Sequence, residues 1–60
     1  MANYLFEFAE GDSEGERFFV QTDSVDEAID AAIELFPFDV LRYCGSYGNF
    51  EAEILGYDTY

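Results

Sequence analysis

The stretch Ser24–Pro37 reads SVDEAIDAAIELFP and decides the fold. Ser24 and Glu27 have the spacing of a capping box, in which the Ser24 hydroxyl accepts from the Glu27 amide and the Glu27 carboxylate accepts from the Ser24 amide. Apolar side chains follow at spacings of three and four, as on a helix with one buried face; they are Val25, Ala28, Ile29, Ala32, Ile33 and Phe36. Pro37 disfavours helical geometry at Phe36. We therefore predict one amphipathic helix that begins at Ser24 and ends at or just before Phe36.

The chain before this helix has the pattern of a hairpin. Between residues 4 and 9, Tyr4, Phe6 and Phe8 alternate with Leu5, Glu7 and Ala9, which is the period of a strand. Residues 17–22 form a second aromatic and β-branched run, and residues 11–15 between the two runs include two glycines, which adopt positive φ without strain. We predict two strands joined by a five-residue loop.

The chain after the helix has the pattern of a second hairpin. Residues 38–44 are rich in β-forming side chains, residues 45–49 have turn composition, and residues 50–57 alternate apolar and acidic side chains. The predicted fold is α+β and ββαββ: one domain, residues 1–60, with a four-stranded, largely antiparallel sheet and one helix on one face. Because one helix covers only one face, we expect apolar sheet surface to be exposed on the other.

The composition favours a basic partner. Fourteen Asp and Glu stand against two Arg, with no Lys or His, for a formal net charge of −12 in 60 residues. This charge opposes direct binding to nucleic acid or an anionic membrane and favours basic surfaces. The single cysteine, Cys44, excludes an internal disulfide framework, and no signal peptide or apolar run of membrane-spanning length is present. We expect a cytoplasmic protein with no membrane segment.

The side chains needed for common catalytic chemistry are missing. Nucleophilic catalysis requires a nucleophile with a base, but there is no His or Lys, and we expect Cys44 to be a small, half-buried residue of a strand. Asp12, Glu14 and Glu16 alternate beside glycines like the start of a calcium loop, yet the bidentate Glu at its twelfth position is absent. We expect no enzyme activity, no catalytic residue, no cofactor and no metal.

A row of carboxylates follows the predicted helix. Asp26, Asp30 and Glu34 recur every four residues, about 6 Å apart along the axis, with Glu27 beside them. Like charges at this spacing are mildly destabilising, and no cation is interleaved to relieve them. The alternative is an ordinary solvated helix face whose first-turn acids complement the helix dipole. Further acids lie in the hairpin loop and the last predicted strand; they are Glu10, Asp12, Glu14, Glu16, Glu51 and Glu53.

In size, charge and aromatic content the chain resembles the small acidic proteins with which bacteriophages disable host nucleic-acid enzymes: uracil-DNA glycosylase inhibitors, anti-restriction proteins and anti-CRISPR proteins. Phe38-Asp39-Val40-Leu41, followed by Tyr47-Gly48-Asn49, looks like the aromatic and acidic segment of the short dimeric uracil-DNA glycosylase inhibitors. In this chain residues 42–46 place the two parts of the segment further apart than in those inhibitors, and the predicted helix lies before the segment. The resemblance implies that Phe38 or Tyr47 enters an apolar pocket of the enzyme and that Asp39 lies near its DNA-binding groove.

Two functions therefore remain open. The first is a DNA-mimic inhibitor that blocks the basic, nucleic-acid-binding surface of a host protein such as a uracil-DNA glycosylase, a CRISPR effector or a restriction enzyme, within the host cytoplasm if the chain is phage-encoded. The second is an acidic adaptor or accessory protein whose sheet face forms a homodimer or binds a host protein. The candidate partner-binding residues are Asp26, Glu27, Asp30, Glu34, Asp12, Glu14, Phe38, Asp39 and Tyr47.

Overall fold

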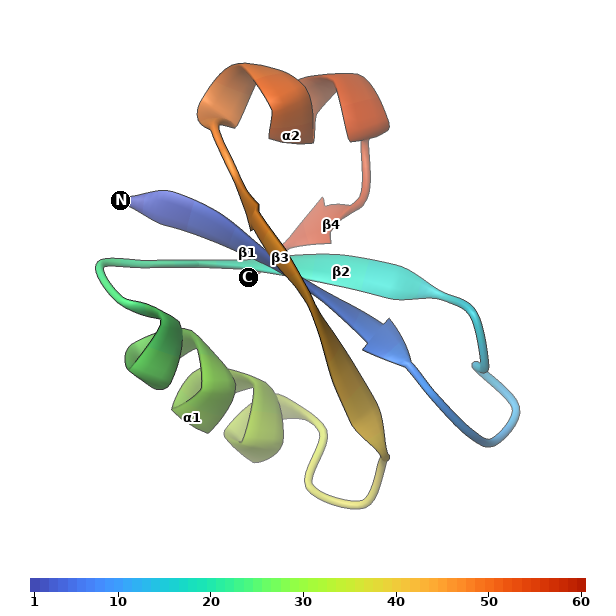
Figure 1. The fold of residues 1–60 in the computed structure, drawn as a ribbon. Helices are drawn as coiled ribbons and strands as arrows, with labels where there is room; N and C mark the ends of the chain where they lie inside the picture. Colours follow the sequence, from blue (N-terminus) through green and yellow to red (C-terminus); the bar gives the residue numbers. More distant parts are fainter.

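The computed structural model describes all residues, Met1–Tyr60, as an α+β fold with one four-stranded sheet and two helices (Figure 1). In chain order the elements are β1 (Ala2–Phe8), β2 (Arg17–Thr22), α1 (Val25–Leu35), β3 (Leu41–Tyr47), α2 (Asn49–Leu55) and β4 (Asp58–Thr59). The strand order is β3-β1-β2-β4; β1 is antiparallel to both neighbours, whereas β4 is parallel to β2. The α+β class is confirmed, but the sheet is mixed and a second helix is present.

The first hairpin and α1 agree with the sequence patterns. β1 and β2 pair with Glu7 opposite Arg17, and both loop glycines, Gly11 and Gly15, have positive φ. The Ser24 hydroxyl accepts from the Glu27 amide at 3.2 Å, and α1 begins at the next residue. α1 ends at Leu35, two residues before the proline, so its predicted bounds are confirmed.

The predicted second hairpin is wrong. Residues 45–47, expected in a turn, continue β3, and most of the expected last strand is the helix α2. The start of α2 is fixed by the Glu51 carboxylate, which accepts from the Gly48 amide at 3.4 Å, and its end by Gly56, which has φ of 73° and donates to the Ala52 carbonyl. Glu, Ala and Leu in residues 51–55 are strong helix formers, so helix propensity outweighs the short alternating pattern.

The two helices cover opposite faces of the sheet (Figure 1). On the α1 face the core consists of Phe6, Phe18, Val20, Ala28 and Ala32. On the α2 face it consists of Leu5, Phe19 and Ala52, with Cys44 half-buried against it as expected. Leu5 and Phe19 are covered, so the expectation of an exposed apolar sheet face is wrong for this part of the sheet.

Candidate partner-binding surface

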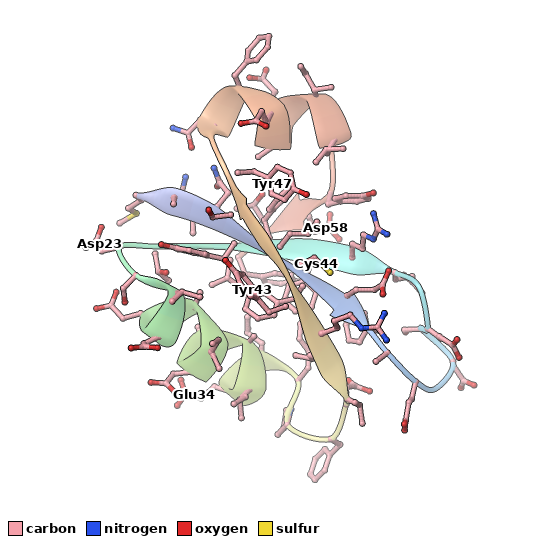
Figure 2. All side chains as sticks on the ribbon, viewed as in Figure 1. Asp23, Glu34, Tyr43, Cys44, Tyr47 and Asp58 are labelled. Atoms are coloured by element: carbon pink, nitrogen blue, oxygen red, sulfur yellow. The ribbon has the colours of Figure 1, made fainter.

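The acidic row of α1 lies on the surface of the helix. Ala28 and Ala32 are buried against the sheet, and this orientation leaves Asp26, Asp30 and Glu34 exposed. Glu34 projects from the outer side of α1 (Figure 2). Glu27 is also exposed. First-turn acids interact favourably with the helix dipole, but Glu34 is in the last turn, which carries no basic residue. Helix stability therefore does not account for Glu34.

Both cationic side chains of the protein are bound to the same carboxylate. Arg17 Nε lies 3.1 Å from Glu7 Oε2, and Arg42 Nη1 lies 2.9 Å from Glu7 Oε1. The hydrogen bond that Arg17 donates to Glu7 raises the pKa of Arg17, and a smaller contribution comes from a hydrogen bond with Tyr57. With both arginines bound to Glu7, the other thirteen acidic side chains have no ion-pair partner within the chain. The negative surface is therefore not neutralised internally.

Acidic residues of two loops flank the end of the sheet at which β1 ends and β3 begins. The rings of Phe8 and Phe36 are 5.0 Å apart between centroids, and the Ala9 amide donates to the Val40 carbonyl at 2.8 Å. These contacts join the start of the β1–β2 loop to the α1–β3 loop. Asp12 and Glu14 are exposed in the first loop and Asp39 in the second. Asp39 therefore adds a carboxylate just after the end of the α1 row, whereas the β1–β2 loop extends away from α1 (Figure 1).

An apolar groove lies beside this row, between α1 and β3. Its volume is about 260 Å³, and it is lined by Phe6, Ile29, Ala32, Ile33, Phe36, Pro37, Asp39, Leu41 and Tyr43. The groove exists because α1 packs mainly on β2 and β1 and covers the side chains of β3 only in part. Ile33 is 57% exposed and Tyr43 43% exposed. Asp39 contributes a carboxylate to the lining.

The aromatic residues of the segment 38–49 do not form one site. Phe38 is 97% exposed in the α1–β3 loop, whereas Tyr47 is half-buried and packs on Phe19 with ring centroids 5.9 Å apart. Figure 2 shows Tyr47 beside α2, on the other side of the sheet from Tyr43. The length of β3 separates Phe38 from Tyr47 by about 20 Å. Phe38 and Asp39 remain candidates at the acidic end, but Tyr47 belongs to the α2 core.

Sequence patterns missed the groove residues. Ile29 and Ile33 belong to the apolar stripe and were expected against the sheet, yet they lie at its margin and are exposed. The sequence indicates this exposure through the width of the apolar stripe. Only Ala28 and Ala32, at the centre of the stripe, are buried, and the branched side chains beside them remain uncovered. The acidic side chains are spread out, and no three potential ligands gather as a metal ion would need.

No family model, curated protein or solved structure matches the chain. Function is therefore inferred from the residues of this chain. Neither helix has the length and apolar character required to cross a membrane.

Proposed function

We propose that the protein is an acidic inhibitor that binds the basic, nucleic-acid-binding surface of another protein and blocks it by charge mimicry. The observation that carries the proposal is the pairing of both arginines with Glu7, because it leaves an exposed row of carboxylates on α1 without any cation. Nucleic-acid enzymes bind phosphates through Lys and Arg, and the same side chains attract carboxylates. The target classes are a uracil-DNA glycosylase, a CRISPR effector or a restriction enzyme.

The charge has the magnitude that mimicry needs. The molecule is 30 Å long. A DNA duplex of that length carries about 18 phosphate charges, so the net charge of −12 is about two-thirds of the duplex charge. The α1 row alone is more dilute, at about 6 Å per carboxylate. Mimicry therefore involves the α1 row together with Asp39, which follows α1, and the exposed acids of the β1–β2 loop.

The alternative function, an adaptor whose sheet face binds a partner, requires an exposed apolar sheet face. Leu5 and Phe19, which lie on the face away from α1, are covered by α2, so this part of the sheet offers no large apolar contact area. The remaining exposed apolar side chains lie in the groove and on the outer side of α2, where Phe50 is 76% and Ile54 69% exposed. Apolar areas of this size can add contacts to an interface that is mainly charged, but they are too small to form an apolar interface by themselves.

The test uses two variants with the same change in charge. Asp30→Asn with Glu34→Gln removes two carboxylates from the α1 row, and Glu53→Gln with Asp58→Asn removes two exposed carboxylates elsewhere. Each tagged protein is used to capture partners from bacterial lysate at low and then high salt, with mass spectrometry of the eluates and an activity assay of any nucleic-acid enzyme recovered. We expect the first variant to lose capture and inhibition and the second to retain them.

Two results would contradict the proposal. Equal inhibition by both variants would show that α1 is not the mimic surface. Recovery of a partner that resists high salt and has no nucleic-acid-binding surface would contradict charge mimicry itself and favour an adaptor.

A further inference from the structure

Strand β3 is an open edge of the sheet. It pairs with β1 on one side and has no strand on the other. Ala9 donates to the Val40 carbonyl, and the register then places Leu41 opposite Phe8 and Tyr43 opposite Phe6. In an antiparallel ladder, residues whose backbone groups bond to the neighbouring strand alternate with residues whose backbone groups point away from it. Val40 bonds to Ala9, the residue after β1, so the backbone N–H and C=O groups of Leu41 and Tyr43 point away from β1, toward the open edge. An edge of this kind accepts an additional strand.

The open edge and the apolar groove are adjacent. Leu41 and Tyr43, whose backbone groups face the edge, also contribute their side chains to the groove, opposite Ile29 and Ile33 of α1. Figure 2 shows Tyr43 on the α1 side of β3. A strand added at the edge would direct every second side chain to this face of the sheet. Those side chains would cover Ile33 and Tyr43, which are both partly exposed.

We propose that the β3 edge and the adjoining groove bind an extended segment of a basic partner protein as an additional strand. The residues that would contact this segment are Ile29, Ile33, Asp39, Leu41 and Tyr43. Backbone hydrogen bonds to the edge supply affinity, and apolar side chains at alternate positions enter the groove, as in other cases of strand addition. Lys or Arg residues flanking the segment meet Asp39 and the acids of α1. This inference rests on the proposed function, which supplies the basic partner.

Charge complementarity selects this occupant over a second copy of the chain. Two copies joined antiparallel along β3 would place both α1 rows on the same face of one continuous sheet, and each copy has a net charge of −12. Arg42, the only cation on β3, is already bound to Glu7. A second copy therefore offers no free cation to Asp39, whereas a basic segment does.

The first experiment uses a synthetic peptide probe, Lys-Arg-Val-Thr-Val-Thr-Val-Arg-Lys, labelled for fluorescence anisotropy and titrated with the protein. We expect saturable binding of one peptide per chain. Two further peptides carry N-methyl groups either on the valines or on the threonines. We expect one of these two peptides to bind more than about tenfold more weakly, because its methyl groups replace the N–H hydrogens that face β3, and the affinity of the other to change by less than about twofold. Equal losses of affinity for the two peptides would exclude strand addition.

A matched pair of protein variants locates the contact. Ile33→Asp places a carboxylate in the groove, and Ile54→Asp places one on the exposed side of α2. Because both isoleucines are exposed, we expect both variants to retain the fold, and both gain the same charge. Circular dichroism checks the folding. We expect Ile33→Asp to weaken peptide binding by about tenfold or more, because it disrupts an apolar anchor contact, and Ile54→Asp to have little effect. Equal binding by the two variants would overturn the proposal.

Failure here can be distinguished from failure of the proposed function. If the N-methyl peptides or the Ile33→Asp variant give the contrary result while the α1 double variant still loses inhibition, the mimic function stands and the docking inference is wrong. Equal binding of a peptide with Glu in place of Lys and Arg would show that the occupant need not be basic. Sedimentation showing a dimer of the free protein that Ile33→Asp dissociates would assign the edge to a second copy and overturn the proposal.

Discussion

Glu7 lies directly opposite Arg42 across β1 and β3, and its Oε1 is 2.9 Å from Arg42 Nη1. On its other side Glu7 lies opposite Arg17 in β2, with Oε2 3.1 Å from Arg17 Nε. One carboxylate on the central strand β1 thus binds a guanidinium from each neighbouring strand. This arrangement removes both cations from the rest of the surface and makes the remaining acids available to a partner.

Replacing Glu7 tests how much this pairing stabilises the sheet. We expect Glu7→Gln to lower Tm by no more than about 5 °C, because exposed ion pairs contribute little in water. Glu7 raises the pKa of Arg17. The contribution of Arg17 to the free energy of unfolding is therefore present at neutral pH and is lost only as the pH rises through the raised pKa. Thermal unfolding at pH 7 is the measurement. Glu53→Gln, which removes an exposed and unpaired carboxylate, is the control and should leave Tm unchanged or higher. A larger loss for the control would contradict the pairing.

The amide of Asn3 holds α2 to the sheet. Asn3 is 3% exposed, and its Nδ2 donates to Asn49 Oδ1 at 2.8 Å. Asn49→Ala removes this acceptor, so we expect a loss of about 1–3 kcal/mol in the free energy of unfolding, measured in urea. Asn49→Asp keeps an acceptor at the N-terminus of α2, where a negative charge is favourable, and should unfold close to the wild type. Equal stability of the Ala and Asp variants would show that the bond is not structural.

The sequence was sufficient where several local signals agreed. In the segment 24–37 the cap, the apolar period and the proline all indicate one helix, and the observed α1 has those bounds. In the first hairpin the alternation and the glycines agree in the same way. The exposure of Asp26, Asp30 and Glu34 follows directly from the helical period, so this part of the candidate surface was predictable.

The segment 45–57 was misread because its local signals conflict. Phe50, Ala52 and Ile54 alternate with acids like a strand, whereas the helix formers of residues 51–55 and the glycines at positions 48 and 56 indicate a helix. The groove could not be predicted either, since it depends on which strand α1 leaves uncovered, and that is decided by the strand order β3-β1-β2-β4. Strand order arises from contacts between residues far apart in the chain, which a local pattern does not contain.

The end of α2 provides a matched test with glycines. Gly56 has φ of 73°, the left-handed conformation of a helix C-cap, whereas Gly48 has φ of −73°. Gly56→Ala is expected to cost about 1–2 kcal/mol in the free energy of unfolding, because a side chain is strained at positive φ. Gly48→Ala is expected to cost less, since a Cβ there would lie 3.6 Å from Glu51 Oε1, an ordinary contact. Urea unfolding measures both variants, and equal losses would contradict the helical cap at Gly56.

Salt should have opposite effects on the free protein and on its complex. The compact chain holds a net charge of −12, so its self-repulsion is relieved as the Debye length falls, and we expect Tm to rise between about 50 and 500 mM NaCl. Over the same range the complex with a basic target should weaken by at least about tenfold, because the contacts between its carboxylates and the target's cations are screened. Thermal unfolding of the free chain and a binding titration at each salt concentration provide the two curves. The double variant Asp30→Asn with Glu34→Gln should bind with a shallower salt dependence than the control variant Glu53→Gln with Asp58→Asn. An affinity that stays constant or increases with salt would mean that apolar contacts dominate the interface, since burial of apolar surface is not weakened by screening.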